Sequence, residues 1–172
     1  MRPDRAGYVS NSHSSGKDVG VNRRTRAAAA VLAACCAGCV SHPVGPARTY
    51  GKYEGKAVTT AEGVVSAVQT ARMAAQTASK GNSFGPYIGT VASESEDAAS
   101  GLQGTFDSIQ PPDARADNLR TRLDKLIADA VTHLADLRVS LRRGELADAT
   151  KTARPLRKDF KRLSAFVDEH KS

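Results

Sequence analysis

The sequence has few of the residues that cross-link a protein or hold it in a membrane. It has no tryptophan, and phenylalanine and tyrosine contribute only four residues each to a length of 172. The three cysteines all lie between residues 35 and 39, so no disulfide cross-links the rest of the chain. The longest apolar stretch, residues 27–40, is shorter than the about 20 residues of a membrane-spanning helix. These shortages exclude a disulfide-stapled scaffold and argue against a permanent membrane span.

This apolar stretch follows a basic segment and contains a cysteine motif. Residues 22–26 include three arginines, and residues 32–35 are Leu-Ala-Ala-Cys. A positive segment followed by a short apolar one is the layout of an export signal. The motif resembles the lipobox of bacterial lipoproteins, which places an aliphatic residue three positions before the cysteine. The resemblance implies that the chain is cut before Cys35 and that a lipid on Cys35 holds the protein on the extracytoplasmic face of the cell membrane.

Two alternatives to lipidation at Cys35 stay open. Cys39 also follows a small residue, Gly38, and would leave a longer apolar segment before the cut, although Cys36 stands where the aliphatic residue belongs. A plain secretory signal, cut elsewhere and with incidental cysteines, is the second alternative. All three interpretations predict export.

The sequence predicts three regions. Residues 1–34 form a leader and signal peptide, and the polar residues 1–20 are interpreted as the product of a mis-set start codon, with Val21 as the alternative start. Residues 35–57 form the lipidated N-terminus and a flexible tether, because the prolines and glycine in this segment oppose both helix and strand. Residues 58–172 are predicted to form a helical bundle.

Four helices are predicted in residues 58–172. Thr59 and Glu62 form a capping box, which predicts that the first helix begins at Thr59. Pro86 suits the first turn of the second helix, where its missing N–H would be unpaired anyway. The first two helices are therefore expected to begin near residues 59 and 86.

Apolar residues recur at spacings of three and four in each helix, which places them on one face. The clearest stripe, in the third helix, comprises Leu119, Leu123, Leu126, Ala130, Leu134, Leu137 and Leu141. The fourth continues through Leu146, Ala149, Ala153, Leu156, Phe160, Leu163 and Val167. Four such helices with short connections predict an all-α fold, an antiparallel up-down four-helix bundle.

Two local features of these helices carry further expectations. Gly101 and Gly104 weaken the second helix, and they are expected to let a neighbouring helix approach closely. Pro155 lies on the outward side of the fourth helix and is expected to kink or divide it.

Positive charge is concentrated near the C-terminus. The formal net charge is +7, but residues 1–34 contain six Lys/Arg and two Asp, so a chain cut before Cys35 carries +3. The predicted basic surface comprises Arg154, Arg157, Lys158, Lys161 and Arg162. It is either an ordinary solvated face or a surface that meets anionic lipid headgroups or cell-envelope polymers. Nucleic acid is not expected as a partner, because an exported domain seldom meets it and Phe160 is the one aromatic residue among these cations.

The sequence offers little catalytic chemistry. His133 is the one histidine on a predicted helix stripe, with Asp129 and Asp136 one turn to either side. Metal sites in helical bundles combine glutamates and Glu-x-x-His pairs from several helices, and no such set occurs. We therefore expect a structural histidine, no catalytic residues, no metal and no cofactor, and predict that the protein is not an enzyme.

The function predicted from the sequence is that of a membrane-anchored, non-catalytic binding or interaction module of the cell envelope. Its expected partners are the membrane, through the N-terminal lipid, and an anionic polymer, a lipid headgroup or a protein. The alternative is a carrier of haem or another small molecule. In a carrier the ligand would occupy a cavity between the helices, lined by Ala71, Ala75, Ala98 and Leu126.

Overall fold

The computed structural model describes residues 46–81 and 85–171. In this part of the chain there are helices and no strands, which confirms the all-α fold. The helices are α2 (Tyr50–Ser79), α3 (Gly85–Asp107), α4 (Ala114–Arg142), α5 (Ala149–Thr152) and α6 (Leu156–His170). The predicted signal peptide, both candidate lipidation sites and the alternative start lie outside the described residues.

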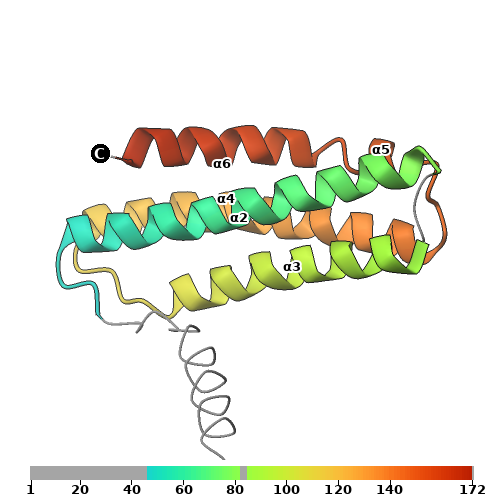
Figure 1. The fold of residues 1–172 in the computed structure, drawn as a ribbon. Coiled ribbons are helices and arrows are strands. Elements are labelled where there is room, and N and C mark those ends of the chain that lie inside the picture. Colours follow the sequence, from blue (N-terminus) through green and yellow to red (C-terminus); the bar gives the residue numbers. More distant parts are fainter. Residues whose placement is uncertain (1–45, 82–84, 172) are drawn as a thin grey trace, which may run out of the picture. The chain divides into compact units, whose positions relative to one another are not determined.

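The four long helices run antiparallel to their neighbours in the chain and form a bundle (Figure 1). Helix α2 packs against all the other helices, whereas α3 packs against α2 and α4 only. Helices α3 and α6 therefore lie on opposite sides of the α2/α4 pair, as the yellow-green and red ribbons of Figure 1 show. The predicted up-down order of four long helices is confirmed.

The core is built from the predicted stripes. All seven stripe residues of α4 are buried, and Leu123, Leu134 and Leu137 are fully so. Helix α2 contributes mostly alanine and valine, which lets the helices that surround it come close. At the end where α2 begins, two aromatic side chains fill the core: the Tyr53 and Phe106 rings lie 5.2 Å apart and both are fully buried. Offset aromatic pairs at this distance stabilise a core beyond the area that they bury.

The expected start of the first helix is wrong. Helix α2 begins at Tyr50, and Thr49 caps it by accepting a hydrogen bond from the Lys52 N–H at 3.4 Å. Thr59 lies inside the helix, where its hydroxyl donates to the Gly55 carbonyl at 3.0 Å. Threonine satisfies its hydroxyl in this way within helices. Residues 50–57, which we assigned to the tether, therefore belong to the bundle.

The last predicted helix is divided at its proline, as expected. Helix α5 ends at Thr152 and α6 begins at Leu156, with Pro155 at the N-cap position of α6. The turn between α4 and α5 uses Gly144 at a φ of 78°, a left-handed conformation that glycine adopts without steric cost. The break lets α5 turn across the end of α2 before α6 runs back along the bundle (Figure 1).

The close helix contact involves a different glycine from those expected. Nothing lies within 4 Å of a Cβ built at Gly101 or Gly104, so neither accommodates a neighbour. At Gly63 of α2 a Cβ would lie 2.6 Å from Cδ1 of Leu102 on α3. The α2–α3 approach therefore depends on Gly63. No helix in residues 46–81 and 85–171 has both the length and the apolar character needed to cross a membrane.

Candidate functional site

Most of the α5–α6 segment carries almost only positive charge at its surface. Residues 149–166 contain five exposed or part-exposed cations in addition to Lys151, and a single acid, Asp159. Asp159 is buried, and its Oδ2 lies 2.7 Å from Nδ1 of His133 on α4. Because the one carboxylate of the segment points into the bundle, the positive charges of its outer face are not balanced locally.

Five of these cations, together with Arg72 of α2, line one open groove, which we call the cationic groove. It consists of two depressions of about 570 and 550 Å³ that share Lys151, Arg154 and Arg157 in their walls. The complete set of cations is Arg72, Lys151, Arg154, Arg157, Lys158 and Lys161. Ala75 and Ala153 lie among them, and their small side chains leave the groove hollow. The groove is open to solvent and lies between α2, α5 and α6.

Helix α5 is held against α2 by polar contacts at the groove. The hydroxyls of Thr150 on α5 and Ser79 on α2 lie 2.6 Å apart. Arg72 reaches the groove from α2, where its Nη1 donates to Oε1 of Gln69 at 2.8 Å. Its guanidinium also lies 5.4 Å from the centre of the Phe160 ring on α6, a cation–π distance. Arg72 is therefore positioned by two neighbours before any ligand arrives.

Arg162 behaves differently from the other four members of the predicted basic surface. Its Nη1 lies 2.8 Å from Oδ2 of Asp129 on α4, so its charge is compensated within the bundle. Arg154, Arg157, Lys158 and Lys161 line the groove. Within the residues that the structure describes, no carboxylate lies at ion-pair distance from any of the six groove cations. The groove is thus a surface of uncompensated positive charge.

The placement of the groove at a helix start adds to this charge. Arg157 and Lys158 occupy the first turn of α6, whose N-cap position, Pro155, provides no side-chain cap. The N-terminal end of a helix carries partial positive charge, so cations there cost stability, typically about 0.3–1 kcal/mol each when exposed. The same arrangement raises the positive potential in the groove. Functional sites commonly contain residues that are unfavourable for stability, as these cations are.

The acids that flank His133 on α4 do not join it in a common site. His133 pairs with Asp159 of α6, Asp129 pairs with Arg162, and Asp136 is exposed. Each pair ties α4 to α6. His133 is thus one half of a contact between two helices. In the described ranges no three His, Cys, Asp or Glu side chains converge in a way that could hold a metal ion.

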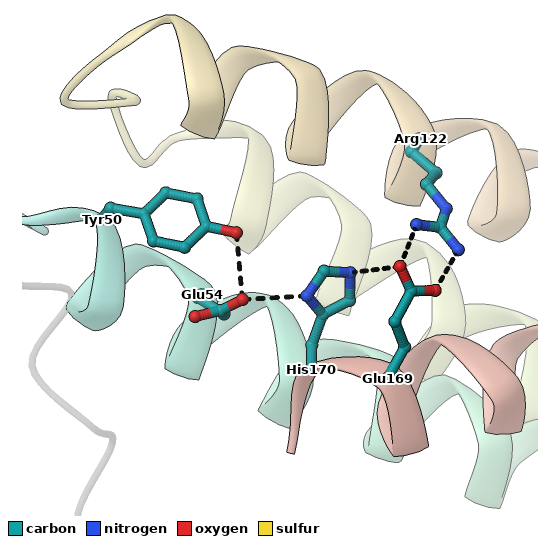
Figure 2. A network of polar contacts seen from close by, with 5 residues as sticks. All are labelled: Tyr50, Glu54, Arg122, Glu169 and His170. Carbon is teal, nitrogen blue, oxygen red and sulfur yellow. Dashed lines mark hydrogen bonds and ion pairs between the residues drawn. The ribbon is translucent and has the colours of Figure 1, made fainter. Parts of the chain in front are cut away.

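A second polar cluster lies at the opposite end of the bundle, where α2 begins and α6 ends. Figure 2 shows its five side chains, which come from α2, α4 and α6 and which we call the terminal polar cluster: Tyr50, Glu54, Arg122, Glu169 and His170. The Tyr50 hydroxyl donates to Oε1 of Glu54 at 2.9 Å, and Nδ1 of His170 lies 2.9 Å from the same oxygen. Arg122 forms a two-pronged ion pair with Glu169.

The polar groups of the terminal polar cluster contact one another. Burial acts to raise the pKa of the Glu54 carboxyl, but hydrogen bonds from His170 and Tyr50 and the nearby charges of His170 and Arg115 outweigh it, so the pKa is lowered. The charged form of Glu54 is therefore satisfied by its protein neighbours. These contacts fasten the three helices α2, α4 and α6 to one another.

The cavity expected for a carrier is not formed by the residues predicted to line it. Ala71 and Ala75 are fully buried, and Leu126 is nearly so, but Ala98 is exposed on the outer face of α3. Its neighbour Ala99 is buried in its place. Because α3 turns Ala99 and not Ala98 toward the core, these four side chains do not enclose a common space.

Sequence reasoning missed Arg72 and His170. Arg72 is separated by 79 residues from Lys151, and only the packing of α2 against α5 and α6 brings the two together. His170 lies beyond Val167, the last residue of the predicted stripe, yet its side chain is 13% exposed and bonded to α2. The apolar position of Phe166 one turn earlier was the available signal, since its ring lies 4.6 Å from that of His170.

Comparison with known proteins adds no further identification. No family model, curated protein or solved structure matches this chain.

Proposed function

We propose that this chain is a membrane-anchored, non-catalytic binding module of the cell envelope, and that its cationic groove holds an anionic ligand. The observation that carries the binding role is the set of six cations that line a solvent-open groove without a carboxylate at ion-pair distance in the described chain. Anchoring is supported by the resemblance of residues 32–35 to a lipobox.

The groove favours binding over catalysis. Its walls hold arginines, lysines, a threonine, a glutamine and alanines, and neither a histidine nor a carboxylate is among the lining residues. General acid–base chemistry needs a group that titrates near the working pH. Arginine and lysine at an open surface stay charged, which suits the attraction of an anion and provides no proton relay.

The anchoring part of this proposal is tested by mass spectrometry of the processed N-terminus in the producing cell. We expect a diacylglyceryl group on Cys35, and we expect Cys35→Ala to abolish both the modification and recovery from the membrane fraction. Cys39→Ala is the matched control, and it should retain both. Recovery of an unmodified chain that still begins at Met1 contradicts the anchoring.

The binding part is tested by charge reversal in the groove. A triple variant with Lys151→Glu, Arg154→Glu and Arg157→Glu should lose its cross-links to anionic envelope components in intact cells. The matched control reverses three exposed lysines elsewhere in the bundle, Lys52, Lys80 and Lys125, and changes the net charge equally. Equal loss in both triple variants would show that only net charge matters and would overturn the groove as a site.

A further inference from the structure

The geometry of the cationic groove points to an extended, phosphate-bearing polymer as its ligand; this inference rests on the proposed function. Four properties of the groove bear on the choice: its hollow shape, the row of its cations, the types of their side chains, and its distance from the point where the chain enters the bundle.

The shape of the groove suits a chain better than a flat surface. Its two depressions adjoin each other and form a trough whose base includes Ala75 and Ala153. Arg72 lines it from α2, and the other five cations line it from the α5–α6 segment. A strand of polymer can lie along such a trough and meet several of these cations. A bilayer surface would touch only its rim.

The cations run along the α5–α6 segment. Lys151 lies on α5, Arg154 lies in the turn before Pro155, and Arg157, Lys158 and Lys161 lie on α6; all five line the same depression. A row of charges of this kind matches a ligand that repeats its own charge. A single small anion would engage only part of it.

The side-chain types favour phosphate. Three of the six cations are arginines, whose planar guanidinium donates two parallel hydrogen bonds to a phosphate or carboxylate. The lysines act as point charges with three rotatable donors each. Phosphate presents oxygens in several directions, so donors on opposite walls of a trough can reach the same group. A planar carboxylate presents two oxygens in one plane and uses fewer of these donors.

The position of the groove favours a polymer over the membrane that would carry the anchor. Arg72 lies 22 residues after Tyr50 on one unbroken helix, about 33 Å from the start of α2. The chain enters the bundle at that start, and Figure 1 places α5 and the beginning of α6 at the opposite end. The groove thus lies at the end of the bundle opposite the start of α2, where an extended polymer could reach it.

The test compares three anionic probes on the full chain, made by cell-free synthesis without membranes so that it carries no lipid. The probes are inorganic polyphosphate, polyglutamate of matched charge, and vesicles of phosphatidylglycerol with phosphatidylcholine. We expect polyphosphate to bind most tightly, and we expect the triple reversal at Lys151, Arg154 and Arg157 to weaken it about 100-fold. The reversal of Lys52, Lys80 and Lys125 should change the affinity less than about threefold.

Two further readouts make the inference specific. For single strands of nucleic acid the slope of log affinity against log salt is about 0.7 per neutralised phosphate, so the groove reversal should flatten the slope by about two. The double variant Arg154→Lys and Arg157→Lys keeps the charge and removes the two-pronged guanidinium donors, so it should weaken polyphosphate binding while the salt slope stays unchanged. Circular dichroism verifies that each variant keeps its helices. The reversals at the start of α6 favour the helix dipole, so loss of fold is not expected.

The outcomes separate this inference from the proposed function. Preferred binding of vesicles or of polyglutamate, with loss in the groove variant, would overturn the phosphate polymer and leave the anion-binding role standing. Failure to bind any of the three probes would overturn both. Polyphosphate binding that the groove reversal leaves unchanged would show that the site lies elsewhere, which also overturns both.

Discussion

Tyr53 is a buried tyrosine whose hydroxyl has no hydrogen-bond partner among the described residues. Its ring is useful to the core because it is fully buried and packs against Phe106. The hydroxyl is costly, since a polar group that leaves water without a new partner destabilises the folded state. Burial also raises the pKa of Tyr53 to about 12.

Tyr53→Phe should therefore raise the free energy of unfolding by about 1 kcal/mol at neutral pH, because it removes an unpaired buried hydroxyl and keeps the ring. A pH effect follows with a definite sign. The tyrosine ionises more easily in the unfolded chain than in the folded one. The free energy of unfolding of the unmutated protein is therefore unaffected by this group below pH 10 and falls as the pH rises towards 12. Tyr53→Phe should lack this fall. Urea unfolding at neutral and alkaline pH measures both effects. A less stable variant at neutral pH would contradict the prediction and imply a partner for the hydroxyl.

At the scale of elements, α6 is attached to α4 by two side-chain pairs. His133 and Asp159 form one, and Asp129 and Arg162 form the other. The two differ in burial: Asp159 is 3% exposed, whereas both members of the second pair are more than a third exposed. Exposed ion pairs contribute little to stability, and a buried carboxylate that loses its partner is expensive. The first pair should therefore dominate.

We expect His133→Ala to lower the free energy of unfolding by about 2–3 kcal/mol, because Asp159 is left buried without its hydrogen bond. Arg162→Ala is the comparison and should cost less than about 1 kcal/mol. Combining His133→Leu with Asp159→Leu removes both polar groups and should recover most of the loss. If the double variant is as unstable as His133→Ala, the cost comes from lost packing and not from the unpaired carboxylate.

The glycines of the helices should respond to substitution in opposite ways. Gly101→Ala and Gly104→Ala should each stabilise the protein by about 0.5–1 kcal/mol, because both positions are helical and have open space for a methyl group. Gly63→Ala should give no such gain, because its new methyl would meet Leu102 at 2.6 Å. Thermal unfolding of the three single variants measures the difference. A stabilising Gly63→Ala would mean that Leu102 moves aside at no cost.

The elements were predictable where the signal was long and failed where it was short. The leucine stripe of α4 extends over six helical turns, and each of its seven residues is buried. The capping box at Thr59 is a four-residue pattern, and it was outweighed by Tyr53 and Ala57, which continue the α2 stripe upstream at a spacing of four. Gly51 and Gly55 had concealed that continuation, since glycine lowers the intrinsic preference for helix.

At the scale of the whole molecule, the first turns of α2 are part of the domain. A chain that begins at residue 58 loses Tyr53, Ala57 and the α2 half of the terminal polar cluster. We expect it to be at least about 3 kcal/mol less stable than a chain that begins at residue 44, since loss of a buried aromatic side chain alone costs about that much. Chemical denaturation of the two truncated chains gives the comparison. Equal stability would show that residues 50–57 are not part of the cooperative unit.

The candidate site was only partly predictable for a reason that concerns the whole molecule. The cations of residues 154–161 are close in sequence, and their spacing away from the apolar stripe was sufficient to predict an exposed basic surface. Neither the concavity of that surface nor the contribution of Arg72 follows from spacing, because both depend on how α5 turns across α2 and on how α6 runs back from Pro155. The compensation of Arg162 by Asp129 likewise requires the α4–α6 packing.

The walls of the cationic groove come from both ends of the bundle sequence, so the groove forms only when the whole bundle has folded. One wall is contributed by α2, the first helix of the bundle to be synthesised, and the other by α5 and α6, the last two. A nascent, clipped or C-terminally truncated polypeptide presents Arg72 without Lys151, Arg154 or Arg157 opposite it. Binding at the proposed groove would therefore require both halves of the chain to be intact and packed together, and a truncated copy would not bind the ligand.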